Sequence, residues 1–169
     1  QGPWALFTSG SKSFNIPAFT GAYGFIPEEN ERDSYLQALK GRDGLSSPSV
    51  PALVAHIAAY RDGAPWLDAL RDYLQANMRY VADTLNNAFP ALCWQPPEAT
   101  YLAWIDLRPL NVDDRALQQA LIAEQKVAIM PGYTYGPEGN GFLRLNVGCP
   151  REKLERGVEG LIAALRSLS

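Results

Sequence analysis

The most informative stretch of this chain is the eight-residue segment TSGSKSFN at residues 8–15. It follows a short apolar run at residues 3–7, which reads as a strand, and it places Lys12 beside three serines and a glycine. A hydroxyl-rich turn with exposed backbone amides forms an anion-binding concavity that suits a phosphate. A lysine beside such a turn can condense with an aldehyde once a dry pocket or nearby cationic groups make its amine more nucleophilic.

A phosphate and an aldehyde on one small molecule describe pyridoxal phosphate, so this segment is a candidate cofactor site. Clusters of serine, threonine, glycine and lysine are also common in ordinary solvated turns, in which the lysine is a surface amine. The residues of the segment by themselves leave both interpretations open.

The composition narrows the classes of function. A chain of 169 residues is long enough for one domain or two small ones. Its net charge is −3 and it has no basic stripe, so nucleic acid is not an expected partner. No apolar run approaches the roughly 20 residues that span a bilayer. Two cysteines are too few for a disulfide framework, and a single histidine argues against a His/Cys metal site, so we expect a cytoplasmic protein without a metal.

Turn signals and hydrophobic spacing predict the elements of the first part of the chain. We expect strands over 3–8 and 21–26, a helix over 33–40 and an apolar helix over 48–60. The second helix is expected to bury Val50, Leu53, Val54, Ile57 and Ala58. Because the two strands have no visible partners, we expect this segment to be disordered, rearranged or packed against a second copy.

Periodicity is clearer in the remainder. A long amphipathic helix is expected between the cap residues at 62–63 and Pro90. After it we expect strands over 101–107, 126–130 and 142–147, and helices over 113–125 and 150–168. Their inward sets are expected to be Leu117, Leu121 and Ile122 in the first helix and Leu154, Val158, Leu161, Ile162 and Leu165 in the second.

Arg144 is unusual because it lies inside a largely apolar strand, FLRLNV at residues 142–147. Strand alternation places it on one face with Phe142 and Asn146, and places Leu143, Leu145 and Val147 on the other. A buried guanidinium is costly unless its charge finds a partner. A substrate carboxylate bound bidentately is one candidate partner, and a nearby acidic side chain in a structural ion pair is the other.

Four segments together resemble the fold-type I pyridoxal phosphate enzymes, and more narrowly the MalY/PatB group of carbon–sulfur β-lyases (cystathionine β-lyase type) in the class I/II aminotransferase superfamily. They are SGSKSFNIPAFTGAYG at 9–24, GRDGLSSPSV at 41–50, PGYTYG at 131–136 and FLRLNVGCPREKLERG at 142–157. The resemblance implies a mixed α+β or α/β fold. It divides the chain into a remnant of the large cofactor-binding domain at 1–62, a connecting helix at 63–89 and a small C-terminal α+β domain at 90–169.

The resemblance also implies roles for single residues. Lys12 matches the Schiff-base lysine, which holds pyridoxal 5'-phosphate and later moves the substrate Cα proton. Ser9 and Ser11 match positions that bind the cofactor phosphate, although either could simply satisfy its own turn. Arg144 matches the arginine that binds the substrate carboxylate.

Other positions carry weaker expectations. Tyr133 is a candidate for the substrate entrance, although packing explains it equally well. The serines at the start of the segment 46–48 resemble a loop that reaches a neighbouring active site in the family dimer, and a helix cap is the simpler interpretation. We expect His56 to be structural.

One position departs from the transaminase pattern. Many aminotransferases carry an arginine eight residues after the lysine, which pairs with the phosphate, and this chain has Thr20 there. The difference favours a lyase over a transaminase.

The expected function, in a longer homodimeric parent, is cleavage of the C–S bond of small cysteine-derived amino acids by β-elimination, which releases a thiol, pyruvate and ammonia. The alternatives are a pyridoxal phosphate-dependent aminotransferase and, in another class, a regulatory protein that binds a transcriptional activator. Because the chain lacks an initiator methionine and family members are much longer, we expect a C-terminal portion that is inactive alone.

Overall fold

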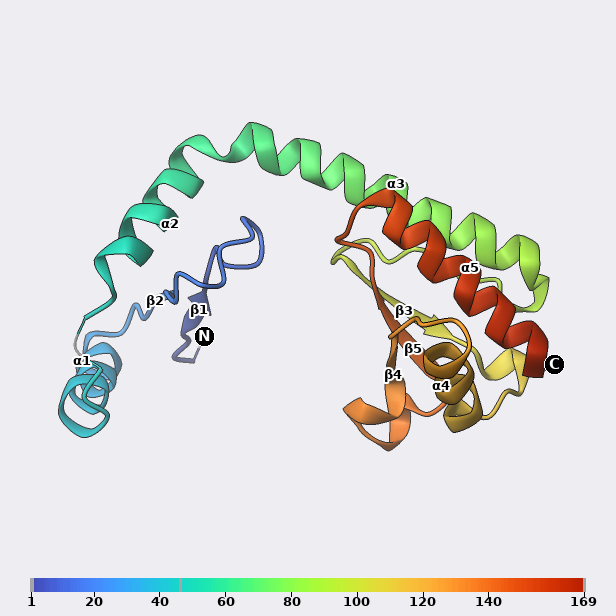
Figure 1. The fold of residues 1–169 in the computed structure, drawn as a ribbon. Coiled ribbons are helices and arrows are strands. Elements are labelled where there is room, and N and C mark those ends of the chain that lie inside the picture. The colour runs from blue at the N-terminus through green and yellow to red at the C-terminus, as the bar shows by residue number, and fades with distance from the viewer. Residues whose placement is uncertain (1, 46, 169) are drawn as a thin grey trace. The chain divides into compact units, whose positions relative to one another are not determined.

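The computed structural model describes residues 2–45 and 47–168 and divides into two compact units, Gln1–Leu70 and Arg71–Ser169 (Figure 1). Ser46, part of the loop expected to reach a neighbouring site, lies outside the described residues. No helix in the described part of the chain is both long enough and apolar enough to cross a membrane.

The first unit begins with a β-hairpin. Strands β1 (Leu6–Thr8) and β2 (Tyr23–Phe25) pair in antiparallel fashion, with Phe7 opposite Gly24. The strands that had no visible partner in the sequence are thus partners of each other, because the loop at 9–22 reverses the chain. The expected packing of this segment against a second copy stays a prediction. An added Cβ at position 24 would lie 2.6 Å from Cδ1 of Phe7, so a side chain there would have to displace the Phe7 ring.

Helices complete this unit. Helix α1 (Glu29–Gln37) begins earlier than expected and continues into a π-helical turn over Ala38–Arg42. Helix α2 (Val50–Asp62) starts at Ser49, whose side chain accepts a hydrogen bond from the Ala52 amide, and ends at Gly63. Helix α3 (Ala64–Ala88) follows immediately and runs into the second unit.

The expected inward face of α2 is wrong. Val50 is 70% exposed and Leu53 47%, and the other residues of that set, Val54, Ile57 and Ala58, are exposed as well. Ala52 is buried instead, because the small side chain at this position lets the helix approach the loop that contains Gly21. The large apolar residues therefore lie on the opposite side of the helix from the loop at 9–22, which contains Lys12 and is called the lysine loop below.

The second unit is built on a three-stranded antiparallel sheet. The strands β3 (Leu102–Asp106), β4 (Met130–Pro131) and β5 (Phe142–Asn146) are arranged in the order β3-β5-β4. Arg144 of the central strand lies opposite Trp104 on one side and Met130 on the other. Of the expected strand over 126–130, only Met130 is in a strand.

Three helices cover one face of this sheet: the second part of α3, α4 (Asp114–Ala123) and α5 (Arg151–Leu168). The alternation predicted for β5 is confirmed, because Leu143, Leu145 and Val147 are buried in the core. The other face of the sheet carries Trp104 and Arg144, and in the described part of the chain it contacts Tyr135 of the 3-10 turn Gly132–Tyr135 rather than any of these three helices. This unit is therefore a two-layer structure with one open sheet face.

Helix α4 begins at Asp113, whose carboxylate accepts hydrogen bonds from the amides of Arg115 and Ala116. Leu117 and Leu121 are buried as predicted, but Ile122 is 52% exposed and Ala120 takes its place in the core. Helix α5 buries its predicted stripe except for Ile162, which is half-buried.

Two short 3-10 turns, Gly132–Tyr135 and Pro137–Gly139, connect β4 to β5. Gly132 and Gly139 are buried and meet backbone to backbone, so that a Cβ on either residue would overlap the carbonyl oxygen of the other. This contact fixes the connection that carries Tyr133 and Tyr135.

Candidate functional site

Lys12 lies in the folded loop between β1 and β2. Within it, the Phe14 amide donates to the Gly10 carbonyl at 3.0 Å and the Ile16 amide to the Ser11 carbonyl at 3.0 Å. These bonds form a tight turn around Lys12. The lysine is exposed, and within the described residues its Nζ has no hydrogen bond and no ion pair.

The turn around Lys12 contains several hydrogen-bond donors without an acceptor among the described residues. Among the described residues, no acceptor is paired with the backbone amides of Gly10, Lys12 and Ser13 or with the hydroxyls of Ser11 and Ser13. Backbone amides in such turns, hydroxyls and an ammonium group are the donors that bind phosphate in proteins. The residues present therefore fit a ligand that carries a phosphate and an aldehyde.

Ser9 is the most firmly held hydroxyl of the turn. Its Oγ donates to the Gly21 carbonyl at 2.6 Å and accepts from the Ser11 amide at 3.1 Å. Nε2 of His56, on α2, lies 3.3 Å from the same oxygen. Ser9 and Ser11 are thus linked directly beside Lys12, and their role in binding a phosphate stays a prediction.

Aromatic side chains support the turn from α2 and the start of α3. Phe14 contacts the rings of Tyr60 (centroids 5.2 Å apart) and Trp66 (6.5 Å). The Tyr60 hydroxyl is bonded to that of Tyr23 at 2.9 Å, and this bond raises the pKa of Tyr60. An added Cβ at Gly10 would lie 3.1 Å from the Tyr60 ring, so the absence of a side chain there permits this packing.

Arg144 belongs to the second unit and lies half-buried on the open face of the sheet. Its guanidinium carbon is 4.8 Å from the ring centroid of Tyr135. Within the described residues it has no hydrogen bond and no carboxylate partner. The structural ion pair, which was the alternative to a substrate carboxylate, is therefore not formed there.

Three aromatic rings lie on the same face of the sheet as this arginine, and they contact one another. Trp104 stacks on Phe142 with centroids 5.5 Å apart, and Tyr135 meets Trp104 edge to face at 5.6 Å. A second arginine on this face, Arg108, lies 4.6 Å from the Phe142 ring and pairs with Asp106 at 2.7 Å. The hydrogen bond from Arg108 lowers the pKa of Asp106. Arg108 is thus neutralised by a protein acid, whereas Arg144 is not.

A cavity of about 590 Å³ borders Arg144. Its other cationic lining residues are Lys126, Lys153 and Arg156, and no acidic side chain lines it. This part of the second unit is therefore suited to an anion.

Tyr133 lies elsewhere in the same unit. Its ring packs under the guanidinium of Arg115, 5.0 Å from the ring centroid, and it lines a separate hollow with Asp114 and Asn140. Tyr135, rather than Tyr133, is the neighbour of Arg144. The substrate-binding role of Tyr133 stays a prediction.

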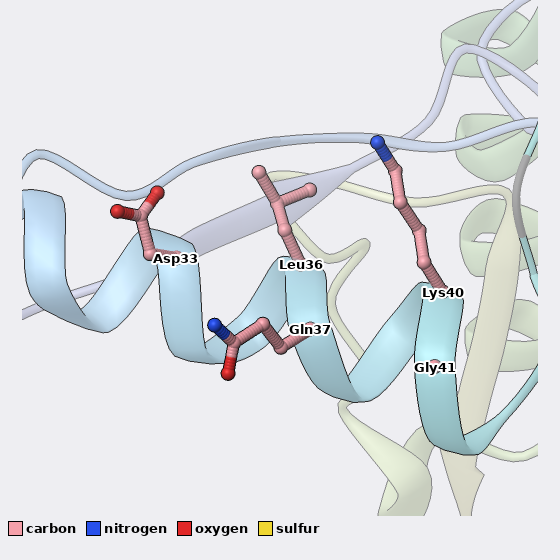
Figure 2. A pocket seen from close by; sticks show the side chains of 5 residues that line it. All are labelled: Asp33, Leu36, Gln37, Lys40 and Gly41. Atoms are coloured by element: carbon pink, nitrogen blue, oxygen red, sulfur yellow. The ribbon is translucent and has the colours of Figure 1, made fainter.

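A further hollow follows α1. Figure 2 shows it along the side of the helix, lined by Asp33, Leu36, Gln37, Lys40 and Gly41. All five residues are exposed, and Asp33 and Lys40 form no ion pair with each other. Because all five residues come from α1 and the π-helical turn that continues it, no distant groups are brought together here, and this hollow does not have the features of a chemical site. The described residues also contain no cluster of acids, histidines or cysteines that could hold a metal.

The contact that sequence reasoning missed is the one between His56 and Ser9. The available signal was the spacing of Ala52 and His56, which are four residues apart and therefore share a helix face. The surrounding bulky aliphatic residues of α2 concealed it, because they suggested that the helix buries its other side.

Comparison with known proteins assigns the chain to a family. It is 71% identical over 99% of its length to Protein MalY of Escherichia coli K12 and 37% identical over 92% to the cystathionine beta-lyase PatB of Bacillus subtilis. Its fold matches the crystal structure of cystalysin from Treponema denticola, which contains pyridoxal 5'-phosphate, with a TM-score of 0.87, 29% identity and 98% of this chain covered.

The chain spans less than half the length of these proteins: 43% of MalY, 40% of PatB and 42% of cystalysin. The expected fold class, a mixed α/β portion of a fold-type I enzyme, is confirmed by this structural match. The sequence model of the class I and II aminotransferases matches residues 1–161, nearly the whole chain. The chain therefore belongs to the aminotransferase class I and II family.

Proposed function

We propose that this chain supplies the lysine and the carboxylate-binding arginine of a pyridoxal phosphate-dependent enzyme that cleaves the C–S bond of cysteine-derived amino acids. The observation that carries the proposal is the turn at Ser9–Lys12, where a free ammonium lies among unpaired amides and hydroxyls. The identity to MalY and PatB supports the same reaction class. In the proposed reaction, β-elimination releases a thiol, and hydrolysis of the remainder gives pyruvate and ammonia.

Each residue then has a defined task. Lys12 would hold the aldehyde carbon of the cofactor through Nζ and, once released, take the substrate Cα proton. Ser9 and Ser11 would donate hydrogen bonds to the phosphate. Arg144 would bind the substrate carboxylate through its planar fork and so keep the Cα–H bond aligned. When bound, pyridoxal phosphate supplies the electron sink that makes this proton removable.

An aminotransferase is the second candidate, because it uses the same lysine, arginine and proton removal. Thr20 is the observation that favours the lyase. It stands where many transaminases have a phosphate-pairing arginine, it is exposed, and its hydroxyl has no hydrogen bond within the described residues. A lyase and a transaminase are separated by product: pyruvate and ammonia in the first case, a 2-oxo acid from an added amino-group donor and no ammonia in the second.

We also propose the parts of the larger enzyme to which these residues belong. Residues 1–62 would be the remnant of the large cofactor-binding domain, 63–89 the connecting helix and 90–169 the small domain. A cytoplasmic homodimer is proposed for the parent. The free thiols of Cys93 and Cys149 support a cytoplasmic location. The exposed apolar side of α2, with Val50 and Val54, supports a homodimer.

The test is covalent labelling. The purified chain is mixed with pyridoxal phosphate, reduced with borohydride and digested, and the pyridoxyl group is located by mass spectrometry. We expect labelling at Lys12 well above that at the other three lysines, Lys40, Lys126 and Lys153. Lys40→Ala is the matched control, because Lys40 is also an exposed lysine of the first unit. Equal labelling of all four lysines would contradict the proposal. The isolated chain is expected to release no pyruvate, because it spans only part of its relatives.

A further inference from the structure

We propose that His56 is a positioning residue for the phosphate site: it holds the Ser9 hydroxyl in the orientation that receives a phosphate oxygen. This inference rests on the proposed function, in which Ser9 binds the cofactor phosphate. It assigns a task to the one histidine of the chain, which was expected to be structural.

The ring of His56 is itself oriented by its own helix. Its Nδ1 lies 2.8 Å from the Ala52 carbonyl, one turn earlier in α2. Because a carbonyl oxygen can only accept, Nδ1 carries a proton in this contact. The bond turns Nε2 away from the helix and toward Ser9, whose Oγ it meets at 3.3 Å.

The hydroxyl of Ser9 has one proton and two lone pairs. The Ser11 amide donates to one lone pair at 3.1 Å, and the Gly21 carbonyl receives the proton at 2.6 Å. In the cationic form of the His56 ring both nitrogens carry protons, and the proton on Nε2 is donated to the second lone pair of Ser9 Oγ. All three positions of the oxygen are then used, and its own proton can turn only between Gly21 and an incoming acceptor.

A phosphate oxygen is such an acceptor. When the Ser9 proton turns to it, the contacts from Ser11 and His56 remain and keep the oxygen in place. Without the ring, one of the two contacts that locate Oγ is lost, and the side chain must be ordered again when the ligand binds. Ordering a side chain on binding lowers affinity.

The packing around the ring shows that this contact is built into the loop. An added Cβ at Gly21 would lie 3.3 Å from Cε1 of His56, and one at Gly10 would lie 3.4 Å from its Cδ2. The ring therefore lies against both ends of the lysine loop at 9–22, beside Gly10 next to Ser9 and beside Gly21 two residues before β2. Glycine at both positions allows this approach.

The experiment compares two aldehydes that differ only in the phosphate: pyridoxal phosphate and pyridoxal. Their affinities for the chain are measured by absorbance titration, and attachment at Lys12 is verified by borohydride reduction and peptide mapping. In the wild-type chain we expect pyridoxal phosphate to bind more tightly. His56→Ala is expected to lower this preference about fivefold, the value of one ordinary hydrogen bond, with the affinity for pyridoxal unchanged.

Three further variants make the result specific. In His56→Gln the side-chain amide can renew the contact with Ser9, so most of the preference is expected to return. Ser9→Ala is expected to abolish the part of the preference for pyridoxal phosphate that comes from this hydroxyl. The double variant Ser9→Ala with His56→Ala should then lose no more of that preference than Ser9→Ala alone. Ile57→Ala, an exposed neighbour on the same helix, should behave as wild type.

The outcomes separate this inference from the proposed function. If Ser9→Ala lowers the preference for the phosphate but His56→Ala does not, the role of His56 is overturned and the proposed function stands. An equal loss of both affinities in His56→Ala, not recovered by His56→Gln, would mean that the ring is only structural. If neither aldehyde attaches to wild-type Lys12, the proposed function fails and this inference fails with it.

Discussion

Arg144 and Tyr135 form a cation–π pair on the open face of the sheet, with the guanidinium carbon 4.8 Å from the ring centroid. The ring is electrostatically attractive to the cation but leaves the five N–H donors of the arginine free for hydrogen bonds. Within the described residues no acid takes them, so the arginine is held in place yet still able to bind a carboxylate.

Replacement of Arg144 by lysine tests this arrangement. Arg144→Lys keeps the charge but loses the planar fork, so we expect about a tenfold weaker affinity for the carboxylate of S-methylcysteine, equivalent to roughly 1.4 kcal/mol, measured by calorimetric titration. The melting temperature should change little, because no protein acid depends on this arginine. Arg108→Lys, on the same face but paired with Asp106, is the control and should leave the affinity unchanged. A large fall in the melting temperature of Arg144→Lys would instead indicate a structural ion pair.

Asn77 should be among the most sensitive positions for stability. It is only 1% exposed, its amide donates to the carbonyls of Val147 and Cys149 at 2.9 and 3.3 Å, and its oxygen accepts from Arg151. Asn77→Ala leaves these groups unpaired, and we expect a loss of about 2–3 kcal/mol in the free energy of unfolding, measured with urea. Asn87→Ala, at an exposed position of the same helix, should cost less than about 0.5 kcal/mol. Equal effects of the two substitutions would contradict the assignment.

Replacing glycine by alanine should lower the stability of the second unit at two positions and raise it at a third. Gly132→Ala and Gly139→Ala are expected to destabilise the second unit by several kcal/mol, on the order of 3 or more, because the added methyl overlaps a main-chain oxygen. Gly157 lies inside α5 with nothing within 4 Å of an added Cβ, so Gly157→Ala should stabilise by about 0.5–1 kcal/mol. Thermal unfolding followed by circular dichroism would show whether the signs differ as expected.

The pair of Asp106 and Arg108 predicts a pH dependence. The hydrogen bond from Arg108 lowers the pKa of Asp106 in the folded chain below its ordinary value of 3.8. The pair therefore stabilises the fold above about pH 4, and this stabilisation is lost as the pH falls through the lowered pKa. The pair is largely exposed, so the effect should be small. The difference in melting temperature between wild type and Asp106→Asn should shrink below pH 4, and a difference that stays constant down to pH 2 would exclude this origin.

The buried faces of helices and strands were predicted correctly from the sequence where one face of the element packs against the core along its whole length. In β5, strict alternation separated Leu143 and Leu145 from Arg144, and in α5 the stripe of Leu154 and Leu161 identified the buried side. These predictions succeeded because one pattern of burial repeats along the whole element, so several residues give the same signal.

The first unit was harder to predict for a physical reason. In α2 the buried side is marked by Ala52 and His56, which are small or polar, while Val50 and Leu53 remain exposed. Hydrophobicity alone points to the wrong side of such a helix. The pairing of β1 with β2 depends on how the 14-residue loop at 9–22 folds back, and that follows from bonds such as Ser9 to Gly21, which no periodic pattern reveals.

The contact between Gly132 and Gly139 has a consequence for how this chain can vary over evolutionary time. Each glycine is constrained by the main chain of the other, and the main chain is the same whatever residues are encoded. A mutation at one position therefore has no compensating mutation at its partner, and a genetic screen for suppressors should not recover one there. Random change without loss of fitness is therefore excluded at both sites together, and lineages that keep this connection should inherit the two glycines as a pair.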